Sequence, residues 1–281
     1  MTDTALVLGS FDGLHIGHMQ VLGASADCKR RVAMVFGTPP AMVIGHKSEL
    51  LMLPDEKNKR LCEMGFEVVP MEFSLVRDIP ADEFLRQLNT RFSPKKICCG
   101  FNYRFGKNAG GDVDMLKRFC LKNGITLSVT PPVESGGERV SSSRIRALIA
   151  DGRPEEAMTL LGRRFEIKGC VESGDGRGRT LGFPTANFDY PQQLVRPRYG
   201  VYAVRCLANG KELKAVCNIG VRPTFSLDKP IVETYILDYS ADLYGKTVSV
   251  GLEKYIRPER VFSSPYELRR QIALDIEAAQ D

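Results

Sequence analysis

The first 130 residues alternate short apolar runs with longer stretches whose apolar residues recur at helical spacing. The apolar runs predict β-strands at residues 5–10, 31–36, 66–70, 96–99 and 126–130. The intervening stretches predict helices after His18 and at residues 55–64, 81–92 and 112–123. Strands that alternate with helices of about ten residues indicate crossover units and a parallel sheet covered on both faces. Ligands of such sheets bind beyond the carboxyl ends of the strands.

The pattern changes after a short helical pair, residues 142–150 and 154–161, which ends at Leu161-Gly162. Beyond it, β-branched and aromatic residues gather in short runs at residues 164–171, 199–207, 213–219, 231–239 and 247–255. Such spacing indicates a small barrel or sandwich. A final helix is predicted at residues 264–279, with Leu268, Ile272 and Ile276 on one face. We therefore expect two unlike domains, residues 1–162 and residues 163–281, the first α/β and the second mainly β.

Length and composition exclude several classes of protein. Of the 281 residues, 43% are hydrophobic and 26% are charged, which excludes disorder, collagen and coiled coil. No uncharged stretch approaches the roughly 20 apolar residues that cross a bilayer, so we do not expect an integral membrane protein. The first residues carry no visible export signal, and we expect the protein in the cytoplasm.

Charge and cysteine usage narrow the possible partners. The net charge is +5 and no dense basic block occurs, so nucleic acid is not an expected partner, whereas small anionic substrates are compatible. The eight cysteines form no CxxC pair and lie in apolar segments. We expect free buried thiols rather than disulfides or a zinc site.

The first chemical signal is GSFDGLHIGH, residues 9–18, where an apolar strand runs into a glycine-containing turn. His15 and His18 are three positions apart at the start of a helix, so both can face one side of the turn. The N–H groups of such a turn can bind phosphate, and two imidazoles can donate to charge that develops on a phosphorus centre. The alternatives are a surface helix with incidental histidines, or a zinc site that lacks further ligands apart from Asp12.

Two further segments of this half suit a nucleotide or a planar ring. SSSRIR, residues 141–146, places hydroxyls, N–H groups and arginines at a helix start, although serine clusters are often only helix caps. GFNYRFGKNAGGD, residues 100–112, follows a buried strand, and its glycines, aromatic and basic residues suit a loop that packs on a ring. A plain turn between a strand and a helix is the alternative for that loop.

The second half opens with GDGRGRTLGFPTANF, residues 174–188. Its glycines, together with Arg177 and Arg179, suit a loop that approaches phosphates closely. Thr185 and Asn187 are hard oxygen ligands two positions apart, which suits Mg²⁺ on a triphosphate. The segment matches neither the P-loop nor the Rossmann fingerprint. A structural hairpin is the alternative.

The chain resembles the bifunctional bacterial riboflavin kinase/FAD synthetase family along nearly its whole length, residues 6–279. The motifs are, in order, GSFDGLHIGH, GFNYRFGK, SSSRIR, GDGRGRTLGFPTANF, CNIGVRPTF, VETYILDYSADLYGK and IRPERVFSSPYELRRQIALD. HxGH is shared widely among nucleotidyltransferases, whereas GRGRTLGFPTAN with a later Glu in VETYILD is characteristic of flavokinases. The resemblance implies an N-terminal Rossmann-like nucleotidyltransferase domain with a parallel sheet. It also implies a C-terminal six-stranded antiparallel β-barrel with a terminal helix.

For the second domain, the resemblance implies transfer of the γ-phosphate of ATP to the 5′-hydroxyl of riboflavin, which gives FMN. Glu233 would be the general base, and Thr185 and Asn187 would hold Mg²⁺ and the ATP phosphates. The residues that the resemblance implies for ATP binding there are Gly176, Arg177, Gly178, Arg179 and Gly182. From its position alone, Glu233 would be taken for an ordinary strand carboxylate.

For the first domain, the resemblance implies that FMN is joined to AMP from a second ATP, which gives FAD and pyrophosphate. His15 and His18 would stabilise the triphosphate during the attack. The implied ATP contacts are Gly9, Phe11, Asp12, Ser142, Ser143 and Arg146, and the implied flavin contacts across both domains are Asn102, Phe105, Arg257 and Phe262. The expected partners are riboflavin, FMN and ATP, and the expected state is a monomer or a weak homo-oligomer.

One departure from the family pattern leaves other functions open. The family usually carries a His-Pro pair after its second strand, whereas this chain has Pro39-Pro40. A working kinase with a weak or lost adenylyltransferase is therefore an alternative. A flavin-sensing or RNA-binding regulator is disfavoured by the low charge and by the presence of Glu233, Thr185 and Asn187. A cytidylyltransferase for another small phosphate would need only HxGH, and the second domain disfavours it.

Overall fold

The structure is a computed structural model that describes residues 3–36, 49–172, 178, 181–221 and 230–280. The chain packs as two compact units, Met1–Ser142 and Ser143–Asp281, and each is described by itself. The domain boundary after residue 162 stays a prediction.

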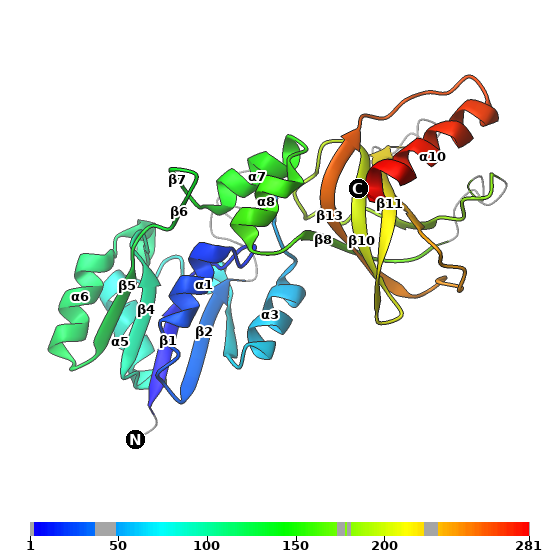
Figure 1. The fold of residues 1–281 in the computed structure, drawn as a ribbon. Helices are drawn as coiled ribbons and strands as arrows, with labels where there is room; N and C mark the ends of the chain where they lie inside the picture. The colour runs from blue at the N-terminus through cyan, green and yellow to red at the C-terminus, as the bar shows by residue number, and fades with distance from the viewer. Residues whose placement is uncertain (1–2, 37–48, 173–177, 179–180, 222–229, 281) are drawn as a thin grey trace. The chain divides into compact units, whose positions relative to one another are not determined.

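The first unit is built on a parallel sheet of five strands in the order β3-β2-β1-β4-β5 (Figure 1). The strands are β1 (Thr4–Leu8), β2 (Arg30–Phe36), β3 (Glu67–Met71), β4 (Lys96–Gly100) and β5 (Thr126–Thr130). All residues of β1 are buried, as expected for a central strand covered on both faces. The strand order reverses between β1 and β4, and ligands of open α/β sheets bind at such a point, beyond the carboxyl ends of the strands.

Helices cover both faces of this sheet. They are α1 (Ile16–Gly23), α3 (Pro54–Glu63), α4 (Phe73–Val76), α5 (Ala81–Phe92) and α6 (Val113–Lys122), with a 3₁₀ turn (Lys107–Ala109) and a hairpin of β6 (Glu134–Ser135) and β7 (Glu138–Arg139). Leu6 and Leu8 of β1 share a core with residues of α5 and α6. Val7 shares a second core with residues of α1 and α3. Successive side chains of a strand point to opposite faces, so one strand supports both cores.

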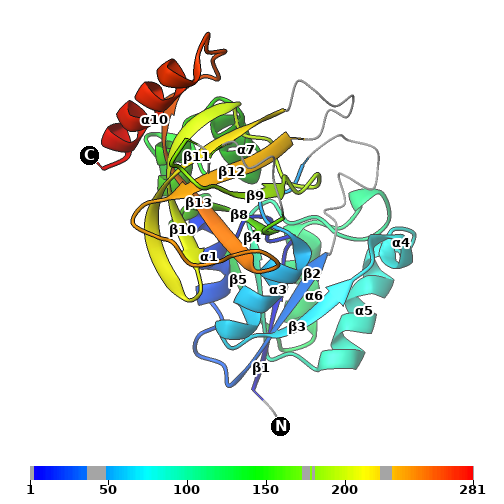
Figure 2. The ribbon, with the colours of Figure 1, turned by 90° about the vertical axis from the view of Figure 1, so that its right-hand side faces the viewer.

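The second unit is a six-stranded antiparallel sheet in the order β8-β13-β10-β11-β12-β9, preceded by two helices and followed by one. The elements are α7 (Ser142–Ala150), α8 (Pro154–Leu161), β8 (Phe165–Cys170), β9 (Ala186–Asp189), β10 (Gly200–Ala208), β11 (Lys211–Val221), β12 (Pro230–Ile236), β13 (Thr247–Arg257) and α10 (Pro265–Gln280). The strands curve into a barrel, and α10 packs against β10, β11 and β13 (Figure 2).

The two edges of this sheet, β8 and β9, meet where Phe188 packs against Gly169. A Cβ atom on Gly169 would lie 2.0 Å from Phe188 Cδ2, a separation that no real contact allows. Phe188 is 3% exposed, so its ring fills the space that the missing side chain leaves. The two edge strands of the barrel therefore approach each other closely because residue 169 has no side chain.

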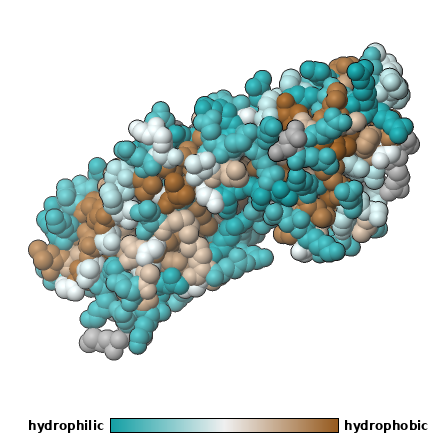
Figure 3. All heavy atoms as spheres, viewed as in Figure 1, coloured by the Kyte–Doolittle hydropathy of each residue, from teal (hydrophilic) through white to brown (hydrophobic). Residues whose placement is uncertain are grey.

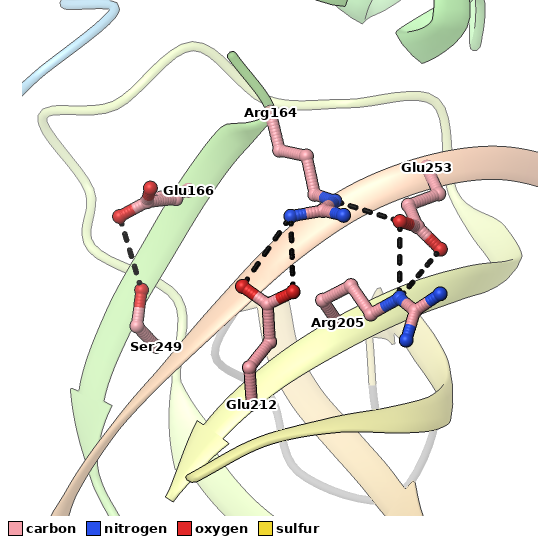
Figure 4. A network of polar contacts seen from close by, with 6 residues as sticks. All are labelled: Arg164, Glu166, Arg205, Glu212, Ser249 and Glu253. Atoms are coloured by element: carbon pink, nitrogen blue, oxygen red, sulfur yellow. Dashed lines mark hydrogen bonds and ion pairs between the residues drawn. The ribbon is translucent and has the colours of Figure 1, made fainter. Parts of the chain in front are cut away.

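A network of ion pairs joins the outer side of the barrel strands (Figure 4). Arg164 Nε donates to Glu253 Oε1 at 2.7 Å, and Arg205 Nε donates to the same oxygen at 3.2 Å. Arg164 Nη1 also donates to both carboxylate oxygens of Glu212 at 3.4 Å. These side chains are partly exposed, so solvent screens them and the network contributes little to stability.

Most of the predicted elements are confirmed in kind, including the parallel sheet and the six-stranded barrel. Several details were wrong, and three of them follow. α1 begins at Ile16, before His18, because His15 caps it. β12 ends at Ile236 rather than at residue 239. β9 is a strand that the residue pattern did not indicate, because it is only four residues long and carries two polar residues.

The surface of the described residues carries few large exposed apolar side chains, and the face drawn in Figure 3 mixes brown and teal patches. Within the described ranges, the structure contains no helix with the length and apolar character that a bilayer crossing requires.

All eight cysteines are free thiols, as predicted. Five of them are buried, whereas Cys62 and Cys170 are exposed and were wrongly expected to be buried.

We expect Gly169→Ala to destabilise the second unit by about 1–3 kcal/mol, because the new methyl group overpacks the closure against Phe188. Urea unfolding followed by circular dichroism measures this. Gly23→Ala is the control, since a Cβ atom on Gly23 would meet nothing within 4 Å. Adding Phe188→Leu to Gly169→Ala should recover part of the loss, and a Gly169→Ala chain as stable as the original would contradict the closure described here.

Candidate active sites

A cavity of about 370 Å³ lies at the carboxyl ends of the parallel strands of the first unit. It is lined by residues at or just beyond the ends of β1, β2, β4 and β5, which is the place expected from the strand order. Six residues that the sequence analysis assigned to nucleotide or flavin binding line it, namely Gly9, Phe11, His15, His18, Asn102 and Ser142.

The turn that follows β1 is shaped by residues in the left-handed backbone region. Phe11, Gly13 and Leu14 have φ values of 52°, 80° and 44°. The buried ring of Phe11 lies against Gly9, where a Cβ would be 2.7 Å from Phe11 Cζ. The same ring meets the His18 ring in a T-shaped arrangement, with centroids 5.4 Å apart. Gly9 therefore makes room for Phe11, and Phe11 supports a predicted catalytic histidine.

The two histidines lie in contact at the start of α1. Their rings stack with centroids 3.6 Å apart and an interplanar angle of 14°. His15 Nδ1 accepts the backbone N–H of His18 at 3.2 Å, so the neutral ring of His15 carries its proton on Nε2. His18 Nδ1 is buried and has no hydrogen-bond partner within the described part of the chain. The pair thus includes one ring nitrogen, His18 Nδ1, that the described residues leave without a hydrogen bond.

His18 is a neutral ring at neutral pH. Burial, followed by the nearby His15 and Lys57, holds the pKa of His18 well below its ordinary value of 6.5. A neutral His18 ring can stack on His15 without repulsion between like charges. It can therefore act as an N–H donor to an oxygen atom of a phosphate, rather than as a cation.

Asp12 holds the turn in place through hydrogen bonds. It is not among the described residues that line the cavity. Its carboxylate, in a residue 3% exposed, accepts the backbone N–H of Leu51 at 3.0 Å. Its backbone carbonyl accepts the hydroxyl of Ser142 at 3.0 Å, so this serine stays beside the turn. Ser143 and Arg146, also predicted for phosphate binding, follow on α7 within the second unit.

Phe105, predicted for flavin binding, lies in the hydrophobic core. It is 6% exposed, and its ring stacks against those of Phe84 and Tyr103, with centroids 5.8 Å and 5.6 Å away. The loop 100–112 reaches the cavity through Asn102 and its neighbours Phe101, Tyr103 and Arg104 instead. Aromatic residues in a loop look alike in sequence, whether they pack inward or on a ligand.

A second cavity, of about 420 Å³, lies in the second unit against one face of the barrel strands and against α10. Six residues that the sequence analysis assigned to the flavin, ATP or Mg²⁺ line it, namely Gly178, Thr185, Asn187, Glu233, Arg257 and Phe262. Val232 and Thr234 on β12 are fully buried, whereas Glu233 between them is only half-buried. Strand alternation thus turns Glu233 toward the cavity.

Glu233 is flanked by two amide side chains on the neighbouring strands. It lies opposite Asn187 of β9 and opposite Asn218 of β11 in the strand register. Residues directly opposite have Cβ atoms about 4.5–5.5 Å apart. Asn187 Oδ1 is buried and has no hydrogen-bond partner among the residues that the structure describes. Asn218 also lines the cavity and was missed, because only the pairing of strands reveals it.

A tight turn brings Gly178 beside Thr185. The backbone carbonyl of Gly178 accepts the N–H groups of Leu181 and Phe183 at 3.2 Å and 2.8 Å. A Cβ on Gly178 would lie 2.4 Å from the carbonyl oxygen of Phe183 and 3.4 Å from Thr185 Oγ1. Only glycine fits there. Gly182 adopts a φ of 88°, in the left-handed region that favours glycine. Four residues that the sequence analysis singled out lie outside the described residues, namely Pro39, Gly176, Arg177 and Arg179.

Arg257 lines the second cavity but bonds to the protein through all three nitrogens. Its Nε and Nη2 donate to the carboxylate of Asp275 at 2.8 Å and 2.7 Å, and Nη1 donates to the carbonyl of Pro258 at 3.0 Å. The centroid of the Phe262 ring lies 5.7 Å from the guanidinium carbon of Arg257. Asp275 is 3% exposed, so the pair fastens α10 to the end of β13.

Asp275 was missed, although the sequence carries a signal for it. It falls on the apolar stripe of the last helix, seven positions after Leu268 and three after Ile272. A carboxylate on the buried face of a helix needs a cationic partner.

Among the described residues, no group of three or more His, Cys, Asp or Glu side chains could hold a metal. A cation would therefore depend on neutral ligands such as Thr185 and Asn187 together with substrate phosphates, and the unpartnered Asn187 Oδ1 fits a hard cation.

Comparison with known proteins matches both units. The model of the FAD synthetase family matches residues 1–144, and the model of the riboflavin kinase family matches residues 161–281. The bifunctional riboflavin kinase/FMN adenylyltransferase of Bacillus subtilis is 32% identical over 290 residues, covering 98% of this chain and 91% of its own. The enzyme of the same name from Escherichia coli K12 is 35% identical, covering 96% and 90%.

A solved structure is similar to the whole chain. It is titled a macrolide-efflux protein from Streptococcus pneumoniae, has a TM-score of 0.90 and is 31% identical. The match covers 100% of this chain and 94% of the solved one. The parallel sheet followed by a barrel is thus a fold found by experiment.

We expect the His18 ring to remain neutral as the pH falls through 6.5, because burial lowers its pKa below that of the unfolded chain. The unfolded chain then binds the proton first, so stability of the first unit is present above about pH 6.5 and declines as the pH falls toward the folded pKa. Nuclear magnetic resonance of the histidine rings measures the pKa, with the urea-unfolded chain as control. A His18 pKa of 6.5 or above would contradict the site described here.

Proposed function

The chain belongs to the family of bifunctional riboflavin kinase/FMN adenylyltransferases, and we propose that its two cavities divide the two reactions between them. The chain is an enzyme that converts riboflavin to FMN with ATP in its C-terminal domain. Its N-terminal domain joins FMN to AMP from a second ATP, which gives FAD and pyrophosphate. The observation that carries the proposal is that each cavity gathers the residues of one reaction.

In the second cavity, Glu233 acts as the general base of phosphoryl transfer. It accepts the proton of the riboflavin 5′-hydroxyl while that oxygen bonds to the γ-phosphorus of ATP. The bond from the γ-phosphorus to the bridging oxygen breaks, and ADP leaves. The position of Glu233 opposite Asn187 supports this role, since the base and the phosphate-binding group then lie on neighbouring strands.

Thr185 and Asn187 would hold Mg²⁺ with the ATP phosphates, through the side-chain oxygens that line the same cavity. Bound Mg²⁺ supplies neutralisation of the negative charge on the phosphates. The buried Asn187 Oδ1, which has no partner among the described residues, supports this assignment. Arg257 fastens α10, which forms one wall of the cavity, and Phe262 covers the guanidinium.

In the first cavity, a phosphate oxygen of FMN attacks the α-phosphorus of ATP, and the bond to the β-phosphate oxygen breaks to release pyrophosphate. FMN supplies its own nucleophile, so no covalent enzyme intermediate is needed. His15 and His18 donate N–H groups to the oxygens that gain charge, and the neutral state of His18 supports this role. Ser142 binds the phosphates, and Asn102 contacts the nucleotide or the flavin.

The partners that follow are small molecules, namely riboflavin, FMN and ATP. Nucleic acid is not a proposed partner, because the net charge is only +5 and is not concentrated in a basic block. We place the reactions in the cytoplasm, where ATP is supplied. A monomer or weak homo-oligomer stays a prediction that light scattering tests.

We expect two variants to separate the reactions. Glu233→Gln should lower FMN formation from riboflavin by about 10²- to 10⁴-fold, since it removes the general base. It should leave FAD formation from FMN unchanged. His18→Ala should do the reverse, lowering FAD formation by about 10²- to 10³-fold. Chromatographic product analysis measures both steps. Loss of both activities in either variant would contradict the division of labour.

We expect Asn187→Ala to raise the Mg²⁺ concentration needed for half-maximal kinase activity by about tenfold or more, because a ligand is lost. Asn218→Ala is the matched control, since it removes an amide from the other side of Glu233. The control should leave the Mg²⁺ requirement unchanged. A Mg²⁺ titration in which Asn187→Ala follows the original curve would rule out the proposed ligand.

A further inference from the structure

Lys57 has no role in the chemistry described so far, yet its placement is unusual. It is the only lysine or arginine that is buried among the described residues, with 2% of its surface exposed. It lies in α3, a mainly polar helix in which Leu61 is the other buried residue. Removing an ammonium group from water costs several kcal/mol, so a buried lysine needs partners at its charged end.

The partners of Lys57 are backbone carbonyls at the ends of two neighbouring strands. Its Nζ donates to Phe36 O at 2.6 Å and to Ser10 O at 3.1 Å. Phe36 ends β2, Ser10 follows β1, and both residues line the first cavity. The ammonium group therefore lies directly behind the wall of this cavity, at the place where the strands present their carboxyl ends.

The charged and titratable groups that face Lys57 come from the turn and from α1. Asp12 in the turn is buried, and its negative charge favours the charged form of Lys57. His18 on α1 feels the positive charge of Lys57, after the larger effects of burial and of His15. Burial outweighs Asp12 and lowers the pKa of Lys57 to about 8. Lys57 is thus charged at neutral pH and loses its charge in mildly alkaline solution.

We propose that Lys57 is a positioning residue for adenylyl transfer, whose buried ammonium group ties the two strand ends together behind the histidine turn and supplies a fixed positive charge there. This inference rests on the proposed function of the first cavity. The reaction brings the phosphate of FMN against the triphosphate of ATP, and both are anions. A fixed positive charge in a low-dielectric wall acts on such anions more strongly than a charge in water. Lys57 itself exchanges no proton with the substrates, because its bonds go to backbone oxygens.

Lys57→Met, Lys57→Arg and Lys59→Met in the full chain test this role. Lys59 is the matched control, since it lies in the same helix with a side chain 74% exposed. FAD formation from FMN and ATP is measured across pH, and FMN formation from riboflavin reports on the second cavity of the same molecules. Circular dichroism reports whether each variant is folded.

We expect Lys57→Met to lower the maximal rate of FAD formation by about tenfold or more, with little change in kinase activity. The original chain should lose FAD formation as the pH rises through about 8, where Lys57 becomes neutral. Lys57→Met should lack this alkaline decline. Lys57→Arg should keep the activity and shift the decline to higher pH, because arginine stays charged. Lys59→Met should match the original chain.

A purely structural lysine would give a different set of results. Lys57→Met that keeps the original rate, or that keeps the alkaline decline at a lower rate, would overturn the inference. If Lys57→Met does not fold, the original chain still decides: a rate of FAD formation that does not fall above about pH 8 overturns the inference. An original chain that makes FMN but no FAD at any pH would instead overturn the proposed function of the first cavity, and this inference with it.

Discussion

Both cavities depend on one constraint, the free energy needed to keep polar groups away from water. A buried polar atom without a partner costs about 1–3 kcal/mol, so such an atom inside a cavity is a place where a ligand can complete the bonding. Among the described residues four buried side-chain atoms lack a partner. His18 Nδ1 belongs to the first cavity and Asn187 Oδ1 to the second, whereas Asn58 and Thr234 line neither cavity. The charged groups at the walls are bonded to the protein instead: Lys57, behind the first cavity, to strand-end carbonyls, and Arg257, which lines the second cavity, to Asp275. Each cavity thus holds one polar atom whose bonding the described residues do not complete.

The sequence predicts most of the elements and the turn after β1 well, because these depend on local information. The spacing of apolar residues separates the α/β half from the β half. Glycines mark the turns in which a side chain would collide with a neighbouring group. Gly9 and Gly178 are such positions, since a Cβ at either would collide with Phe11 or with the backbone of residue 183. The histidine pair is also local, because His15 caps the helix that carries His18.

Other features could not be predicted because they depend on which segments meet in space. Phe105 packs into the core, and a sequence does not tell whether an aromatic ring faces the core or a cavity. Asn218 matters only through its register with Glu233, which the pairing of β11 and β12 sets. Arg257 was assigned to the flavin, whereas its nitrogens bond to Asp275 and Pro258. Lys57 was passed over because the partners of its ammonium group are backbone atoms of distant residues.

One chain thus carries two chemically separate cavities, each lined by residues of its own compact unit. In the proposed function, product FMN from one site is the substrate of the other. The most direct test is a time course of the purified chain with riboflavin, ATP and Mg²⁺, analysed by chromatography, beside a second reaction that starts from FMN. We expect FMN to appear first and to decline as FAD rises, and FMN with ATP and Mg²⁺ to yield FAD. FMN that accumulates without FAD, or no product from either start, would contradict this division of the two reactions.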